Sequence, residues 1–314
     1  MKAILHYAAS PGFRRKLEAL RPGWLSVAVV AESDRAALDA HLPEVEAILH
    51  VLEPLTAQHI AAAPRLRLIQ KIGVGVNTID LAAAAARGIA VANMPGTNSR
   101  AVAEMTLLLM LAALRRLSLL DRHTRAGRGW ACEADLFDGV GEIGGRTVGL
   151  VGYGAVPRIL APMLRALGCR VLYTARTAKD DAVADWRDLE SLLGESDIVS
   201  LHLPLMPETT RLLDARRIAL MKQGAILVNT ARGGLVDEAA LVEALMARRL
   251  MAAGLDVHGH EPVEPGSPLL AIDTVVVAPH VAWLTPETLD RSLTVAFENC
   301  RRLRDGEVLL NRVQ

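Results

Sequence analysis

The amino-acid sequence predicts an α/β protein built from two parallel-sheet domains. Short runs rich in β-branched residues alternate with Ala- and Leu-rich helical stretches along nearly the whole chain, which is typical of βαβ units. A chain of 314 residues is also too long for one ordinary core and suits two domains. Apolar residues make up 51% of the chain and aromatic residues only 3%, so Ala, Leu and Val must fill the cores.

The first part of the chain shows this alternation clearly. The expected strands cover residues 3–7, 27–30, 47–51, 68–71 and 90–92. A helix expected over residues 81–87 ends at Gly88, because glycine adopts the left-handed backbone that commonly terminates helices. Residues 98–120 then predict one long, strongly apolar helix. Its apolar surface is compatible with a dimer contact and equally with a helix buried within one chain.

A second series of elements begins at Arg146. Its expected strands cover residues 147–151, 170–174, 197–202, 225–229, 251–257 and 274–278. Helices are expected between them, for example over residues 238–249, and again over residues 286–304. A last short strand is expected at residues 308–310. If this tail returns to the first domain, that domain is discontinuous in sequence.

Composition and charge exclude several classes of function. Lys plus Arg and Asp plus Glu number 35 each, so no net field favours nucleic acid or an anionic membrane. The longest apolar run, residues 105–114, is shorter than the ~20 residues that a membrane-spanning helix needs. The first residues of the chain predict a strand and do not have the pattern of a signal peptide. Three scattered cysteines, Cys132, Cys169 and Cys300, favour buried apolar roles in a reducing compartment. We expect a cytoplasmic protein without nucleic-acid or membrane partners.

A glycine-rich turn at the start of the second series predicts a dinucleotide site. Gly152 permits a tight turn after a strand, and Gly154 lets backbone N–H groups approach a pyrophosphate at a helix N-terminus. Such turns also occur for steric reasons, but strand, turn and helix here open a new βαβ series. Pro157 replaces the usual third glycine, and Pro162 lies inside the helix, which we expect to be kinked or displaced. The turn residues expected at the cofactor are Gly152, Tyr153, Gly154, Ala155, Val156 and Arg158.

The second strand of this series bears on which dinucleotide is bound. NAD-binding folds usually place an acidic residue there, about twenty residues after the turn, for the ribose 2′-hydroxyl. This chain has Ala175 followed by Arg176 and Thr177. An arginine and a hydroxyl suit a 2′-phosphate, although Arg176 could instead cap a loop or stack on the adenine. We favour NADP(H) over NAD(H).

Polar residues follow three strands of the same expected sheet, where ligands of open parallel sheets bind. They are Arg232, then His258, His260 and Glu261, and finally His280. Reduction of a ketone requires a proton donor such as His, a carboxylate that orients the imidazole, and an Arg that grips a substrate carboxylate. His258 and His260 compete with His280 for the acid role. Together with Glu261 they could suggest a metal site, but no second ligand cluster supports one, and we expect no metal.

Several longer motifs accompany the turn at Gly152. They are residues 73–80 (GVGVNTID), 93–99 (NMPGTNS), 102–104 (VAE), 197–204 (DIVSLHLP), 227–234 (LVNTARGG), 254–257 (GLDV) and 279–280 (PH). With these motifs, in this order, the chain resembles the D-isomer-specific 2-hydroxyacid dehydrogenase family over nearly its whole length. Within that family, Ala175 and Arg176 make it most similar to the NADPH-dependent glyoxylate/hydroxypyruvate reductases.

The resemblance implies a fold and a set of roles. A nucleotide domain, residues 99–283, would be inserted into a substrate domain, residues 1–98 and 284–314. Arg232 would bind and polarise the substrate, His280 would be the acid/base, and Glu261 its carboxylate partner. Backbone N–H groups of Val74 and Gly75 would receive the substrate carboxylate. Cofactor contacts are implied for Thr106, Arg158, His202, Thr230, Ala231 and Asp256. Members are usually dimers, which fits a contact through the region after Asn98.

Departures from the family pattern concern the substrate. The small residues that usually follow the catalytic His are replaced here by residues 281–284 (VAWL). In this run Trp283 either walls the pocket for small acids or packs between domains. Glu261 argues against a formate dehydrogenase, in which the family has Gln. The expected activity is NAD(P)H-dependent reduction of a small 2-keto acid, similar to glyoxylate or hydroxypyruvate, to the D-2-hydroxy acid. The alternatives are an NAD(P)-sensing, corepressor-like interaction protein and a dehydrogenase for another donor such as phosphite.

Overall fold

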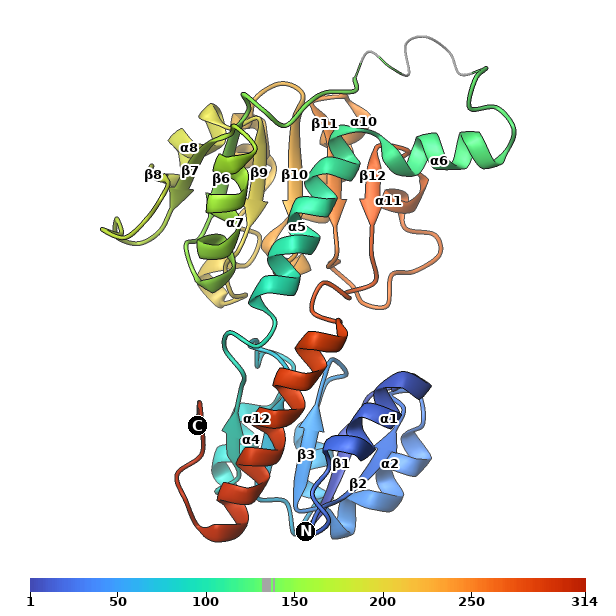
Figure 1. The fold of residues 1–314 in the computed structure, drawn as a ribbon, viewed down its shortest axis with the longest axis vertical. Helices are drawn as coiled ribbons and strands as arrows, with labels where there is room; N and C mark the ends of the chain where they lie inside the picture. Colours follow the sequence, from blue (N-terminus) through green and yellow to red (C-terminus); the bar gives the residue numbers. More distant parts are fainter. Residues whose placement is uncertain (132–136, 138) are drawn as a thin grey trace. The chain divides into compact units, whose positions relative to one another are not determined.

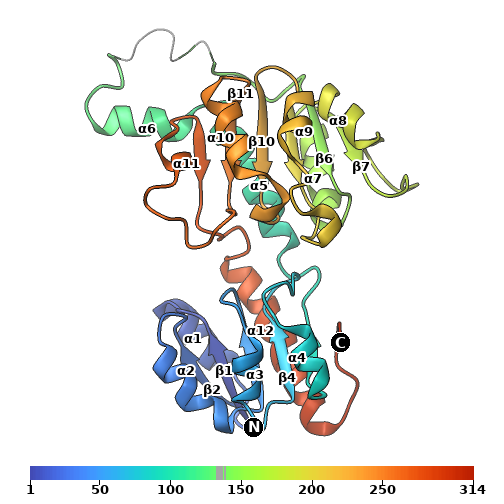
Figure 2. The same cartoon turned by 180° about the vertical axis from the view of Figure 1, so that it is seen from behind.

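A computed structural model describes residues 1–131, 137 and 139–314, and these form two compact units (Figures 1 and 2). Unit 1 comprises Met1–Asn98 and Trp283–Gln314, and unit 2 comprises Ser99–Ala282. Each unit is an α/β domain around one parallel sheet, as the sequence predicts. None of the described helices is long and apolar enough to cross a membrane. Cys169 and Cys300 are buried, as expected, and Cys132 lies outside the described residues.

Unit 1 has a five-stranded sheet of order β2-β1-β3-β4-β5. Its strands are β1 (Lys2–His6), β2 (Ser26–Val30), β3 (Ala47–His50), β4 (Leu68–Lys71) and β5 (Ala90–Ala92). One core joins Ile4, Ile48 and Ile69 of the sheet to helices on one face, namely α2 (Arg35–His41), α3 (Ala57–Ala61) and α4 (Leu81–Ala86). The remaining helices are α1 (Pro11–Leu20) and α12 (Pro286–Asp305), which pack on each other.

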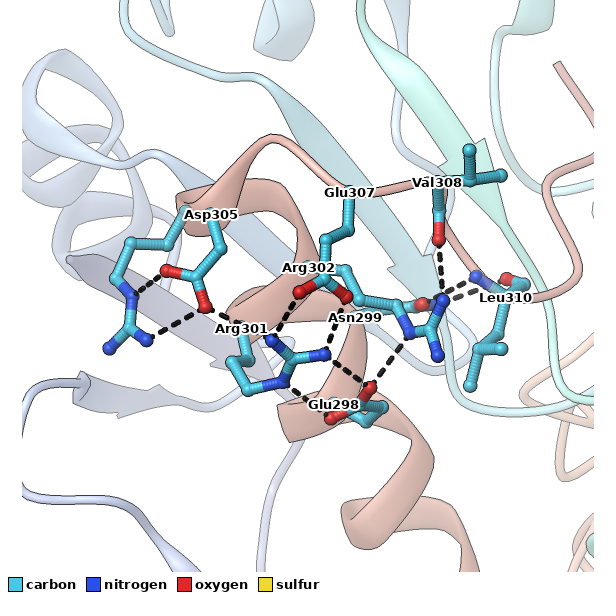
Figure 3. A network of polar contacts seen from close by, with 9 residues as sticks. Glu298, Asn299, Arg301, Arg302, Asp305, Glu307, Val308 and Leu310 are labelled. Atoms are coloured by element: carbon cyan, nitrogen blue, oxygen red, sulfur yellow. Dashed lines mark hydrogen bonds and ion pairs between the residues drawn. The ribbon is translucent and has the colours of Figure 1, made fainter.

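The C-terminal tail returns to unit 1 through polar contacts around the end of α12 (Figure 3). Arg301 bridges Glu298 and Glu307 at 2.9 and 2.7 Å. Asn299 is buried and donates to Gln70 Oε1 at 2.6 Å and to Leu310 O at 3.0 Å. The strand expected at residues 308–310 is wrong. Residues 307–309 have no regular structure, because both the N–H and the carbonyl of Leu310 are bonded to the Asn299 side chain and not to a strand. The tail instead forms an antiparallel bridge between Arg312 and Ala92.

Unit 2 has a seven-stranded parallel sheet of order β12-β11-β10-β9-β6-β7-β8. Its elements in chain order are α5 (Ser99–Leu114), α6 (Leu117–Arg125), β6 (Thr147–Val151), α7 (Ala155–Ala166), β7 (Arg170–Thr174), β8 (Asp185–Trp186), α8 (Leu189–Glu195), β9 (Ile198–Leu201), α9 (Ala215–Leu220), β10 (Ala225–Asn229), α10 (Glu238–Met246), β11 (Leu250–Leu255), α11 (Pro268–Ala271) and β12 (Val275–Val277). One core lies between the sheet and α5 and α7, and another between the sheet and α8, α9 and α10.

In unit 2 one prediction is wrong and one strand was not predicted. The single helix expected over residues 98–120 is wrong, because Arg116 adopts a left-handed backbone, φ 49°, and separates α5 from α6. Strand β8 was not predicted, since two exposed residues carry no periodicity. Helix α7, by contrast, continues through Pro162. The interior proline therefore does not end the helix that follows the glycine turn.

Candidate active site

The glycine turn between β6 and α7 has the backbone that a phosphate cradle needs. Gly152 has φ +101°, and a Cβ there would lie 2.8 Å from the carbonyl oxygen of His202, so only glycine fits. Gly154 is the N-cap of α7, and no described atom lies within 4 Å of the position its Cβ would take. An open backbone at a helix N-terminus suits an anionic pyrophosphate. The residues present therefore fit a dinucleotide.

Side chains beside the turn form a small polar and aromatic cluster. The rings of Tyr153 and Tyr173 lie 4.3 Å apart, and the Arg158 guanidinium lies 5.4 Å from the centre of the Tyr153 ring. Arg158 also pairs with the exposed carboxylate of Asp181. Sequence reasoning missed Asp181, because it is distant along the chain and belongs to no motif. Ala155 and Val156 form the first turn of α7.

The loop after β7 carries the residues expected near the adenosine ribose. Arg176 and Thr177 are exposed, and Trp186 Nε1 donates to the carbonyl of Ala175 at 3.1 Å. Lys179 Nζ lies 3.3 Å from Thr177 Oγ1. The loop thus presents two cations and a hydroxyl together. Lys179 was missed, although a basic residue two positions after Thr177 is a visible signal.

Three further cofactor candidates lie at the carboxyl ends of strands or on the helix that packs against them. His202 follows β9, where Ser200 Oγ lies 3.0 Å from its Nε2 and burial lowers its pKa to about 3. Its imidazole is therefore neutral at physiological pH. Thr106 on α5 and Thr230 after β10 are both buried, with their hydroxyl oxygens 2.8 Å apart. The structure thus brings together two residues that are distant in sequence.

The turn after β10 is shaped by a residue that sequence reasoning did not assign. Asn229 accepts from the Ala231 N–H at 3.0 Å and donates to the Arg232 carbonyl at 2.9 Å. These bonds fix the backbone from which the Arg232 side chain extends. Burial lowers the pKa of Arg232, and the nearby Glu261 carboxylate partly offsets this. The guanidinium remains charged at neutral pH.

Glu261 and His280 form a close pair. Glu261 Oε2 lies 2.6 Å from His280 Nδ1. Glu261 Oε1 accepts from the backbone N–H of His258 at 2.9 Å. Partial burial is the largest single influence on Glu261 and acts to raise its pKa. The hydrogen bond and charge of His280, together with the contacts to His258, outweigh burial, so that the pKa lies below its usual value. Since β10, β11 and β12 are neighbours, the segments that carry Arg232, Glu261 and His280 leave the same edge of the sheet.

Asp256 fastens the segment that contains His280. Its carboxylate accepts from the backbone N–H groups of Val281 and Ala282, each at 2.9 Å. Its carbonyl accepts from the His280 N–H at 2.8 Å. Burial raises the pKa of the Asp256 carboxyl, and the two backbone donors oppose that shift. Asp256, expected beside the nicotinamide, thus also positions the imidazole that follows β12.

The two competing histidines have other partners. His258 is buried, and its Nε2 lies 3.1 Å from the carbonyl oxygen of Ala278. His260 is exposed, and its Nδ1 lies 3.0 Å from the carbonyl oxygen of Pro262. His280 is therefore the imidazole that the structure pairs with Glu261. Within the described part of the chain, no group of three or more His, Cys, Asp or Glu residues is arranged to hold a metal ion.

The expected substrate-binding residues belong to unit 1. Val74 and Gly75 lie in the loop after β4, where the Val74 carbonyl accepts from Asn93 Nδ2 at 2.9 Å and the Gly73 carbonyl accepts from the Met94 N–H at 2.8 Å. These two hydrogen bonds hold the carbonyl groups of Gly73 and Val74 and so fix the backbone of the loop. Trp283 is 8% exposed and packs edge-on against the ring of Tyr7 at 5.8 Å. Its indole therefore contributes to the packing of unit 1.

Comparison with known proteins decides the family. Residues 107–282 match the family model described as D-isomer specific 2-hydroxyacid dehydrogenase, NAD binding domain. The glyoxylate reductase of Aeropyrum pernix is 42% identical over 262 residues, which cover 81% of this chain and 78% of that protein. The chain belongs to the D-isomer-specific 2-hydroxyacid dehydrogenase family. It is accordingly a 2-hydroxyacid dehydrogenase or reductase that uses a nicotinamide cofactor, and its two parallel-sheet domains are consistent with that family's fold.

Two further relatives show how much of a longer relative this 2-hydroxyacid dehydrogenase covers and which solved structure it is similar to. The D-3-phosphoglycerate dehydrogenase of Mycobacterium leprae is 39% identical over 89% of this chain, but the chain spans only 53% of that longer protein. The solved structure of the TT0316 protein from Thermus thermophilus is 38% identical, has a TM-score of 0.89, and is matched over 100% of both chains. The dehydrogenase therefore has the full fold of TT0316.

Proposed function

We propose that the chain catalyses the NADPH-dependent reduction of a small 2-keto acid, similar to glyoxylate or hydroxypyruvate, to the D-2-hydroxy acid. The observation that carries this proposal is the 2.6 Å contact between Glu261 and His280 at the sheet edge that also bears Arg232. The relatives named glyoxylate reductase support the substrate class.

The dinucleotide would be held by the open turn at Gly152 and Gly154, with the hydroxyls of Thr106 and Thr230 and the segment at Ala231 near its nicotinamide end. When bound, the reduced nicotinamide supplies the hydride. The neutral His202 adds no charge beside Gly152. The chain's own residues therefore bind and orient the cofactor, and they supply the proton.

His280 is proposed as the proton donor. A carboxylate oxygen can only accept from His280 Nδ1, so the Glu261 contact fixes a proton on Nδ1. In the proposed step the doubly protonated ring gives its Nε2 proton to the carbonyl oxygen of the substrate, while the Nδ1–H stays bonded to Glu261. The lowered pKa of Glu261 keeps that carboxylate ionised through the neutral pH range.

Arg232 is proposed to bind the substrate carboxylate and polarise the adjacent carbonyl. A guanidinium offers several N–H donors in one plane and matches a 2-keto acid. The backbone N–H groups of Val74 and Gly75 are proposed to complete carboxylate binding, and the bulk of Trp283 to favour small acids.

We also propose that the protein is cytoplasmic. Cys169 and Cys300 are buried free thiols, and free thiols are typical of a reducing compartment.

We also propose that the chain is a homodimer through the region after Asn98. Four large apolar residues of this region are exposed among the described residues, namely Leu108 (53%), Leu117 (54%), Trp130 (94%) and Phe137 (49%). Exposed apolar side chains grouped in one segment indicate a protein contact. Light scattering should give a mass of about twice 33.7 kDa. A monomer at micromolar concentration would contradict the dimer.

The test of the function is a steady-state comparison of NADPH and NADH over a panel of 2-keto acids. Glyoxylate, hydroxypyruvate and pyruvate provide small substrates, and 2-ketoisocaproate provides a bulky one. We expect oxidation of NADPH with one or more of the small acids. Binding of the dinucleotide without turnover of any acid would contradict the proposal.

Replacing Arg176 with Asp tests the preference for NADPH. A charge-assisted bond to a phosphate would be lost and replaced by repulsion, so KM for NADPH should rise about 10- to 100-fold. KM for NADH, which has no 2′-phosphate, should change much less. Arg216→Asp is the matched control, because Arg216 is exposed and paired with Glu190 on another surface. An equal rise for both cofactors would show that Arg176 does not contact the phosphate.

A further inference from the structure

His258 is a buried histidine to which the proposed reaction gives no role. His258 is only 8% exposed. The Ala278 carbonyl, 3.1 Å from Nε2, can only accept a hydrogen bond, so Nε2 must carry the proton and donate. Nδ1 is buried and has no hydrogen-bond partner among the described residues. The ring is therefore held in place by its one bond to Ala278.

His258 contacts each of the three segments that carry the proposed catalytic groups. Its backbone N–H donates to Glu261 Oε1 at 2.9 Å. Its ring donates to the carbonyl of Ala278, two residues before His280. Its own carbonyl oxygen would lie 1.8 Å from a Cβ at Gly233, the residue after Arg232. The segments that carry the guanidinium, carboxylate and imidazole are thus packed or bonded against this one residue.

The segment around His280 needs such restraint. His280 has φ +56°, a left-handed backbone that a residue with a side chain adopts at a cost. The N–H groups of Ala278, His280, Val281 and Ala282 are all bonded to the segment 255–256. Pro279 has no N–H to contribute. The carbonyl oxygen of Ala278, two residues before His280, accepts a hydrogen bond from the ring of His258. This bond restrains the backbone just before the left-handed turn at His280.

We propose that His258 is a positioning residue for the reaction. Its ring N–H fixes the backbone before His280 while its main-chain N–H fixes the Glu261 carboxylate, so that one residue sets the Glu261–His280 geometry. This inference rests on the proposed function, because it assigns His280 the proton transfer. Packing alone does not account for the ring, because an apolar side chain of similar size would fill the space without burying an unpartnered nitrogen.

The variants that separate bonding from packing are His258→Met and His258→Gln. Met and Gln are unbranched and of similar length, but only Gln carries an amide N–H₂ that can donate to the Ala278 carbonyl. His258→Phe is a second non-donating variant with a ring. His260→Met is the matched control, because His260 is an exposed histidine on the same turn.

Steady-state kinetics should separate the variants that can donate a hydrogen bond to the Ala278 carbonyl from those that cannot. We expect kcat to fall about tenfold in His258→Met and His258→Phe, because misplacement of a proton donor lowers the rate steeply. Gln should restore most of kcat, and KM for NADPH should stay within about twofold in all variants, since the glycine turn is not touched. Equal kcat in Met, Phe and Gln variants, whether high or low, would overturn the proposal.

Amide hydrogen exchange of residues 278–282 provides a readout that does not need turnover. Loss of the donor should speed exchange at His280 and Val281 in the Met and Phe variants, and Gln should slow it again. A wild-type protein that reduces no 2-keto acid would refute the proposed function but leave this exchange pattern intact. Exchange that is identical in wild type and in the Met and Phe variants would refute the positioning role even in an active enzyme.

Discussion

Replacing His280 with Ala is expected to lower kcat for 2-keto acid reduction by about 10²- to 10⁴-fold, the usual contribution of a positioned acid. The side chain is 18% exposed and bonded to Glu261, so its removal deletes the proton donor without opening a large core cavity. KM for NADPH and the midpoint of thermal unfolding should change little. The measurement is steady-state kinetics on the most active 2-keto acid, with thermal unfolding of the same sample.

The control for this variant is His260→Ala. His260 lies one residue before Glu261 and is exposed, with its ring bonded to the Pro262 carbonyl, so kcat should stay close to that of wild type. Full turnover by His280→Ala would show that another group donates the proton. Large losses in both variants would indicate a collapsed loop, and the unfolding curve would reveal it.

Replacing Arg232 with Ala is expected to lower kcat/KM for the 2-keto acid by about 10²- to 10³-fold, the loss typical when one donor to a developing charge is removed. Arg232 extends from a turn fixed by Asn229 and is partly buried, so water cannot replace its several N–H groups in the same geometry. KM for the keto acid should rise together with the fall in kcat. KM for NADPH should remain near its wild-type value.

Arg232→Lys distinguishes charge from geometry. Lysine keeps a positive charge but lacks the planar fork of donors, so we expect only partial recovery. Arg216→Ala on the surface is the control and should leave the kinetics unchanged, because Arg216 is exposed and paired with Glu190. If Arg232→Ala changed KM for NADPH but not for the keto acid, the substrate role proposed for Arg232 would be wrong.

Much of the fold could be predicted because it is encoded locally. The alternation of β-branched and Ala/Leu-rich runs predicted the parallel strands, and β4, β5, β6, β7 and β10 have the bounds expected. The break at Arg116 and the two-residue strand β8 could not be predicted. A left-handed residue and a strand of two exposed positions are set by surrounding packing, and neither leaves a periodic pattern.

The candidate site divides in the same way. The turn at Gly152 is local, since strand, glycines and helix are consecutive, and its backbone has the left-handed φ that glycine suits. The loop at Arg176 was also predictable, but its neighbour Lys179 is joined to it through a side-chain contact with Thr177. Asn229 was passed over because its role is to bond its own turn, which no spacing rule identifies.

The sequence by itself determined the two parallel sheets, the glycine turn and the set of polar residues that follow neighbouring strands. Only the tertiary structure decided among three histidines, because it directs His258 to Ala278, His260 to Pro262 and His280 to Glu261. The reason is that strand order, and not distance along the chain, brings residues 261 and 280 together. A pattern of residue types can name candidates for a hydrogen bond, but the partner is chosen by the path of the backbone.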